Sequence, residues 1–167
     1  LIDEAIEGNR VRILRQAIED ASEELSDARK FVEAKIRTNS LNENLLKDLI
    51  EHRRSAEFLL CFAHYVGVDP STAQRILSDR SYESLAIACR AASLERSTFA
   101  KFIFGLQNGI EDQQKSMRVL ELYLKVPQEA AERVMRFWRV RSEAVAAERP
   151  KPASMHSIAE RVAAARR

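Results

Sequence analysis

Hydrophobic residues recur every three or four positions along most of this chain, which is the spacing of an amphipathic α-helix. Stretches of β-branched residues are missing, and the 167 residues include only 4 Gly and 4 Pro. Both features favour helix over strand. The breaks between the predicted helices are a few residues long. The pattern therefore predicts an all-α fold, built as stacked helix-turn-helix repeats of the HEAT type or as an irregular helical bundle.

A unit of helix, sharp corner and helix occurs three times, with corner residues Val68, Leu94 and Val126. Repetition of a corner suggests a packing cause, because stacked helix pairs bury their apolar faces against one another. The apolar residues after the corners align as the triads Ala73/Ile76/Leu77, Phe99/Phe102/Ile103 and Ala131/Val134/Met135. We predict a core made of Leu59, Phe62, Val66, Ile76, Leu85, Ala88, Leu94, Phe99, Phe102, Leu120, Leu124, Val134 and Trp138, with Phe137 also facing inward.

The first corner has the strongest local signals. Gly67 follows an apolar helix at the position where a left-handed backbone is common. Asp69 is a favourable N-cap, and Pro70 is tolerated in the first turn because its missing N–H has no partner there. The sequence therefore predicts one helix that ends near Val66 and another that begins at Pro70.

A long helix is expected over residues 10–37, preceded by a break at Gly8-Asn9. Its apolar positions alternate in steps of three and four, as in a coiled-coil seam. These positions are Val11, Leu14, Ile18, Ala21, Leu25, Ala28 and Val32. The seam predicts either packing against the body of the protein or a homodimer through residues 11–32. Because the chain begins with Leu1 rather than Met, we expect it to be a fragment of a longer protein.

The positive charge is concentrated toward the C-terminus. The formal net charge is +2, yet residues 133–167 hold nine Lys or Arg against three Glu. We expect residues 1–148 to form a single helical-repeat domain. Residues 149–167 would form a basic linker containing Pro150 and Pro152, followed by a short helix or a mobile tail. Such a charge could meet an acidic partner, and the candidate partner-binding residues are Arg133, Arg136, Arg139 and Arg141.

Motifs for catalysis are missing: the glycines do not cluster into a phosphate loop, and no nucleophile elbow occurs. Cys61 and His64, with His52 and Cys89, are conceivable zinc ligands, but both cysteines lie on predicted apolar faces and fit better as core residues. We therefore expect no enzymatic activity, no cofactor and no metal. Two cysteines and no apolar stretch of about 20 residues predict a cytoplasmic protein without a membrane span.

Residues 63–77 also resemble the helix-turn-helix of bacterial repressors, in which a Gly-Val corner leads into a recognition helix. The bases would then be read by Ser71, Thr72, Gln74 and Arg75. Two observations weigh against this interpretation. The same corner recurs at Leu94 and Val126, and the first 132 residues are net acidic, which is unfavourable for phosphate binding. DNA binding through residues 71–77 is therefore the alternative hypothesis.

Residues 45–106 are similar to the C-terminal half of the bacterial "domain of unknown function 2336" family. The segments that carry the resemblance are 45–50, 56–63, 66–68 and above all 85–94, followed by Phe99. The family pattern has a Gly before the corner Leu, where this chain has Ser93. The resemblance implies an all-helical, repeat-like bacterial protein and supplies no catalytic residues. We expect a non-enzymatic, regulatory module that binds a protein partner.

Overall fold

The computed structural model describes residues 2–106 and 113–148. All regular secondary structure in these two ranges is α-helical, which confirms the predicted fold class. The helices are α1 (Ile2–Arg37), α2 (Glu43–Glu51), α3 (Ser55–Val66), α4 (Pro70–Ser78), α5 (Glu83–Ala91), α6 (Arg96–Leu106), α7 (Gln113–Tyr123) and α8 (Gln128–Glu148). The tail expected at 149–167 lies outside the described residues.

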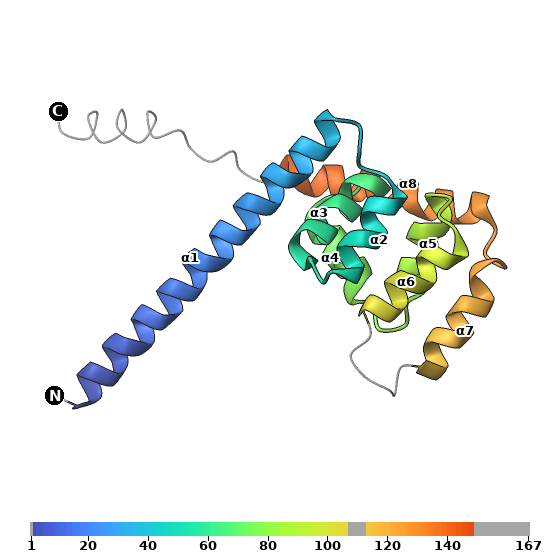
Figure 1. Cartoon of the computed structure of the whole chain (residues 1–167). Helices are drawn as coiled ribbons and strands as arrows, with labels where there is room; N and C mark the ends of the chain where they lie inside the picture. Colours follow the sequence, from blue (N-terminus) through green and yellow to red (C-terminus); the bar gives the residue numbers. More distant parts are fainter. Residues whose placement is uncertain (1, 107–112, 149–167) are drawn as a thin grey trace.

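Helix α1 is longer than the sequence predicted and projects away from the body of the protein (Figure 1). The expected break at Gly8-Asn9 is wrong, since the helix runs through it. A single interior Gly costs a helix only about 1 kcal/mol, which the other turns of a long helix can offset. The C-terminal end of α1 packs on α3. There the Arg54 guanidinium lies 4.5 Å from the ring centroid of Phe31, which ties the two helices together.

The three predicted corners separate the helices of three pairs: α3 from α4, α5 from α6, and α7 from α8. At the first corner, Gly67 has φ +77° and Asp69 is the N-cap of α4, as the sequence predicted. At the second, Ser93 has φ +58°. This left-handed conformation favours glycine, the residue that the resemblance led us to expect in place of Ser93.

A side chain from another helix donates a hydrogen bond to a backbone carbonyl at each corner. Arg139 donates to Val66, the Tyr123 hydroxyl donates to Leu94 at 2.7 Å, and Arg90 Nε donates to Val126 at 3.0 Å. Val66 is the last residue of α3, where carbonyls lack partners within the helix, and Leu94 and Val126 lie in the turns before α6 and α8. The corners are therefore held by long-range contacts as well as by their own sequences.

The core lies between α2, α3, α5 and α6 and extends to α8. Phe58, Phe62 and Phe102 meet there, and the rings of Phe58 and Phe102 form a T-shaped pair at a centroid distance of 5.1 Å. Phe99 stacks on Tyr123 at 4.4 Å. Of the predicted core, the buried residues are Phe62, Val66, Ile76, Leu85, Ala88, Leu94, Phe99, Phe102 and Leu120, and the half-buried ones are Leu59, Val134 and Trp138.

Two core predictions are wrong. Leu124 is 59% exposed because α7 ends at Tyr123, and Tyr123 takes the inward position in its place. Phe137 is 64% exposed because Met135, Trp138 and Ser142 form the inward face of α8. A shift of one residue around a helix moves a side chain by about 100°, which is enough to take it out of the core.

Helices from different pairs pack against each other more than a simple serial stack would require. The most extensive packing joins α5 to α8, and α2 packs on α6 (Figure 1). Of the two predicted architectures, the structure is therefore the irregular helical bundle. No helix in the described ranges combines the length and the apolar composition that crossing a bilayer requires.

Candidate protein interface

Helix α1 carries an apolar face that is covered at one end and uncovered at the other. Ala28 and Val32 are 1% and 7% exposed against the body. One to four turns earlier on the same face, Leu25, Ile18 and Leu14 are 39%, 69% and 63% exposed. We call this uncovered face the α1 stripe and define it as Leu14, Ile18, Ala21 and Leu25. Its large aliphatic side chains lie on one side of the helix because their spacing is three or four residues.

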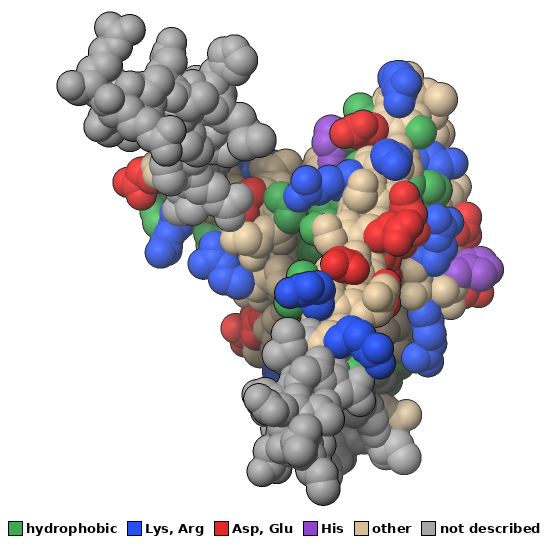
Figure 2. All heavy atoms as spheres, turned by 90° about the vertical axis from the view of Figure 1, so that its left-hand side faces the viewer, with side chains coloured by type: hydrophobic (Ala, Val, Ile, Leu, Met, Phe, Trp, Pro, Cys, Tyr) green, Lys and Arg blue, Asp and Glu red, His purple; other side chains and the backbone are tan. Residues whose placement is uncertain are grey.

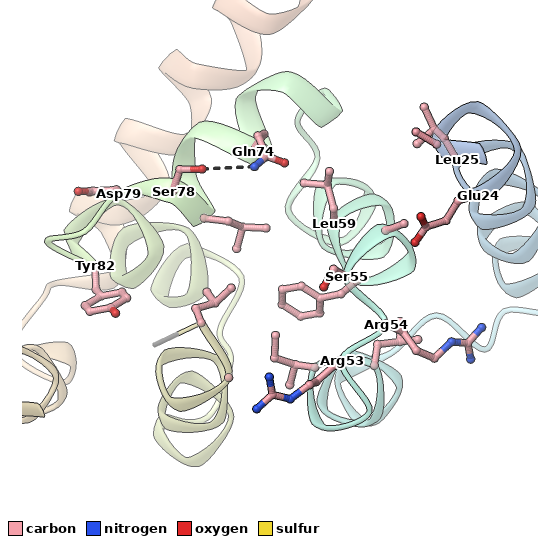
Figure 3. A pocket seen from close by; sticks show the side chains of 18 of the residues that line it. Glu24, Leu25, Arg53, Arg54, Ser55, Leu59, Gln74, Ser78, Asp79 and Tyr82 are labelled. Atoms are coloured by element: carbon pink, nitrogen blue, oxygen red, sulfur yellow. Dashed lines mark hydrogen bonds between the residues drawn. The ribbon is translucent and has the colours of Figure 1, made fainter. Parts of the chain in front are cut away.

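An open groove in the body reaches the α1 stripe at one edge (Figure 3). It measures about 1240 Å³. Most of its lining comes from α2, α3, α4 and α6, and only Ala21, Glu24 and Leu25 come from α1. Leu25 and Glu24 form the α1 side, and Leu59 lies across from them on α3 (Figure 3). Gln74 and Ser78 of α4 also line it, joined by a hydrogen bond of 3.3 Å. The groove therefore continues from the α1 stripe onto the body, with polar and charged side chains among the apolar ones.

The charges on α1 are arranged in blocks. Arg12 and Arg15 lie in the segment before Ile18, whereas residues 16–28 carry five acidic residues and no basic one. Figure 2 looks at the side from which α1 projects, and positive and negative side chains occur next to one another there, with hydrophobic ones between them. By helical spacing, only Arg15 and Glu24 of these lie beside the α1 stripe, and the others lie on the opposite side of the helix.

The four predicted partner-binding arginines of α8 do not all lie on the same face of the helix. Arg133, Arg136 and Arg141 are exposed, and Phe137 and Val140 lie on the same outward face, each 64% exposed. Arg139 is half-buried on another side of the helix. Its Nε and Nη2 donate to the carbonyl oxygen of Val66 at 3.0 and 2.8 Å. Arg139 therefore holds the α3–α4 corner and is not part of the exposed basic surface.

The α3–α4 corner is also where the alternative DNA-reading residues lie. Ser71, Gln74 and Arg75 are exposed, but Thr72 is only 8% exposed. The Thr72 hydroxyl donates to the Asp69 carboxylate and accepts a hydrogen bond from Arg75 Nη2 at 3.2 Å. Two of the four residues are thus engaged inside their own helix. The four side chains are not presented together as one outward surface.

Asp69 is the electrostatic centre of that corner. Its carboxylate accepts hydrogen bonds from the hydroxyls of Thr72 and Ser142 and from the backbone N–H of Ser71. Burial by itself would raise the pKa of Asp69, but these hydrogen bonds outweigh it and hold the pKa well below its usual range. Asp69 therefore stays ionised at neutral pH and links α4 to α8.

The two cysteines are core residues. Burial is the main cause that raises the pKa of Cys61 to about 11, and it also raises the pKa of Cys89 strongly. The reactive thiolate form is therefore scarce at neutral pH. His64, the suggested zinc ligand beside Cys61, is exposed. Within the described ranges, no three His, Cys, Asp or Glu side chains come together in a way that could hold a metal ion.

Sequence reasoning missed two features of these surfaces. The groove could not be predicted because its lining combines α1 with residues of α2, α3, α4 and α6 that lie more than 20 positions further along the chain. The exposed pair Phe137 and Val140 has a sequence signal: their spacing of three residues matches Arg133 and Arg136, so all four share one face.

Comparison with known proteins identifies one family. Residues 2–136 match the model of a family described as "Uncharacterised protein conserved in bacteria (DUF2336)". The match is wider than the predicted resemblance over residues 45–106 and includes α1, so it is not confined to a C-terminal half. No curated protein and no solved structure matches the chain.

Proposed function

We propose that this chain, which belongs to the DUF2336 family of bacterial proteins, is a non-enzymatic regulatory module that binds a protein partner through the α1 stripe and the adjoining groove. The proposal depends on one observation above the others. Leu14, Ile18 and Leu25 lie in line on a projecting helix and remain exposed. Contiguous exposed apolar surface of this kind is typical of protein–protein contact sites.

The energetics favour a macromolecular partner. Burying a Leu or Ile side chain contributes about 1.5–3 kcal/mol, so covering three such residues would drive association substantially. A helix laid along the α1 stripe would contact residues at the spacing that helix-in-groove recognition uses. An extended helical surface also suits a protein-binding module better than an enzyme.

The predicted homodimer seam over residues 11–32 is only partly available. Ala28 and Val32 are buried inside this chain, so a partner can reach the seam only up to about Leu25. The basic residues Arg133, Arg136 and Arg141, with Phe137 and Val140, form a second contact surface in this proposal. Aromatic and Arg residues are enriched at protein interfaces, which supports this assignment.

The DNA-binding alternative has less support. Thr72 is buried against Asp69, and Arg75 is bonded to Thr72. A reading helix needs its side chains free to reach base edges. A salt titration of binding to duplex DNA tests this alternative. Binding with a steep salt dependence that is lost in Arg75→Ala would favour DNA reading and count against the protein-binding proposal.

The main test is a comparative pull-down from the bacterial host. The full chain is compared with the double variant Leu14→Glu/Ile18→Glu and with the control Leu122→Glu, a similar change at a residue that is 53% exposed on α7. We expect wild type and the control to retain the same partner protein, at the same ratio of partner to chain. We expect the double variant to lose this partner. Retention of the same proteins by all three would show that the α1 stripe is not the binding surface.

A further inference from the structure

We infer that the outward surface of α8 binds an acidic, amphipathic helix of the partner protein. We call this surface the α8 surface and define it as Arg133, Arg136, Phe137, Val140 and Arg141. The inference rests on the proposed function, in which these residues form a second contact surface, and it names the chemistry of the partner there. Phe137 and Val140 are each 64% exposed, and the three arginines are exposed beside them.

The positive charges of the α8 surface are not neutralised within the described part of the chain. Every salt bridge found among the described residues lies outside α8. Glu132, one turn before Arg136, accepts a hydrogen bond from Gln128 at 3.1 Å instead. Residues 133–142 hold four arginines and no acidic residue, and only Arg139 among the four is engaged at the α3–α4 corner. Three guanidinium groups are therefore available to carboxylates of a partner, which they bind by charge-assisted hydrogen bonds.

Positive and apolar side chains follow one another along the α8 surface. Arg133, Phe137 and Arg141 are spaced four residues apart, so they form a row along the helix. Val140 lies beside this row, one turn after Arg136. The exposed apolar side chains thus have positive charge at both ends. The complementary helix has an apolar centre with carboxylates about one turn before and after it, and such complementarity favours encounter and fixes the register.

Acidic residues border the α8 surface and limit its length. Glu129 and Glu148 lie beyond its two ends, and Glu132 and Glu143 lie along one edge by helical spacing. Like charges across an interface are unfavourable, so carboxylates of a partner are excluded beyond these points. The matching acidic segment is therefore short, about as long as residues 133–141, or about 12 Å at the rise of an α-helix.

A helix suits this surface better than an extended segment does. Extended peptides commonly bind by pairing with the free edge of a β-sheet. All regular secondary structure in residues 2–106 and 113–148 is α-helical, so these two ranges offer no such edge. A helix forms its backbone hydrogen bonds internally, so only its side chains need partners. Its apolar side chains would pack on Phe137 and Val140, and its carboxylates would reach the arginines.

The test uses synthetic peptides as probes and the full chain as the target. The acidic probe is a helix-forming peptide with Leu at its centre and Glu about one turn before and after it. The matched probe has Lys in place of each Glu. Binding is followed by NMR on isotopically labelled protein. We expect chemical-shift changes at the α8 surface, a dissociation constant at least about tenfold lower for the acidic probe than for the Lys probe, and weaker binding at higher salt.

Charge-reversal variants assign the binding to α8. Arg133→Glu/Arg141→Glu should weaken binding of the acidic probe at least about tenfold. Lys115→Glu/Arg118→Glu makes the same change of charge at exposed residues of α7 and should bind as wild type does. Phe137→Ala should weaken binding of the acidic probe without changing its salt dependence. Circular dichroism checks that the helix content of each variant is unchanged.

Three results would overturn the inference. One is that the acidic probe does not bind, or binds no more tightly than the Lys probe. Another is an equal loss in the α7 control, which would show attraction by net charge alone. The third concerns vesicles of phosphatidylcholine with and without phosphatidylserine: binding to the anionic vesicles but not to the acidic probe would assign the α8 surface to a membrane. None of these results decides the proposed function, because the pull-down with Leu14→Glu/Ile18→Glu tests the α1 stripe separately.

Discussion

Arg139 and Val66 are 73 residues apart in the chain, yet the Arg139 guanidinium donates two hydrogen bonds to the Val66 carbonyl oxygen at 3.0 and 2.8 Å. The carbonyl belongs to the last residue of α3, just before the left-handed Gly67. Arg139 Nε also lies only 3.1 Å from the position that a Cβ at residue 67 would occupy, which is a tight contact. Helix α8 therefore closes the α3–α4 corner, and the small residue at 67 makes room for it.

Replacing Arg139 by Ala should destabilise the fold. Hydrogen bonds from a charged donor contribute about 1.5–3 kcal/mol, and the variant also leaves the Val66 carbonyl without this partner. We expect a loss of that size in the free energy of unfolding, measured by urea denaturation. Arg136→Ala, the same change at an exposed position of the same helix, should stay within about 0.5 kcal/mol of wild type. Equal effects of the two variants would show that the guanidinium–carbonyl contact contributes little.

The corner should also respond to acid through Asp69. Because hydrogen bonds lower its folded-state pKa, Asp69 stabilises the fold above the unfolded-state pKa of about 3.9, and the contribution is lost as the pH falls through the folded-state value. Asn is an equally good N-cap but carries no charge, so Asp69→Asn isolates this effect. We expect Asp69→Asn to be less stable by about 1 kcal/mol at neutral pH. The difference in the free energy of unfolding between wild type and Asp69→Asn should decrease as the pH falls below about 4. A difference that does not change with pH would contradict stabilisation by the ionised Asp69.

Phe99 should be among the most sensitive core positions. It is 0% exposed and stacks on Tyr123 at 4.4 Å. Truncation of a buried Phe to Ala typically costs about 3–5 kcal/mol, because transfer energy is lost and a cavity remains. Phe104→Ala is the matched control five residues along the same helix, where the side chain is 53% exposed. In chemical denaturation, Phe99→Ala should lower the free energy of unfolding several times more than Phe104→Ala does. A decrease below about 1 kcal/mol for Phe99→Ala would show that the core collapses around the smaller side chain or that Phe99 is exposed.

Gly105 allows α6 and α2 to approach closely. An ideal Cβ at residue 105 would lie 2.4 Å from Cγ1 of Ile50, which is too short for any real contact. Ala is a better helix former than Gly by about 1 kcal/mol, but overpacking typically costs about 1–3 kcal/mol. Gly105→Ala should therefore be neutral to destabilising instead of stabilising, as measured by thermal or urea unfolding.

A double-mutant cycle checks the cause of the Gly105 effect. Ile50→Ala removes the clashing Cγ1 atom, so Gly105→Ala should cost less in that background than in wild type. An unchanged cost would assign the effect to the backbone of α6 and not to contact with Ile50.

Local chemistry within one or two turns determined much of this fold. The sequence alone predicted the end of α3 at Val66, the left-handed Gly67, the Asp69 cap and the start of α4 at Pro70, because each depends on neighbours in the chain. The three corners at Val68, Leu94 and Val126 were predicted for the same reason. Buried positions such as Phe99 and Phe102 followed from helical periodicity, and both are confirmed.

The tertiary structure alone decided which side of a mixed helix faces inward and which surfaces remain uncovered. The sequence placed Arg139 with three other arginines, but only the packing of α8 on the α3–α4 corner shows that it points inward. In the sequence, the apolar seam of α1 continues without a break from Leu14 to Val32. Only the position of α3 shows that its C-terminal part, at Ala28 and Val32, is buried and that the part from Leu14 to Leu25 is exposed. The physical reason is that burial depends on segments far apart in the chain, whereas caps and periodicity depend on residues within a few positions of one another.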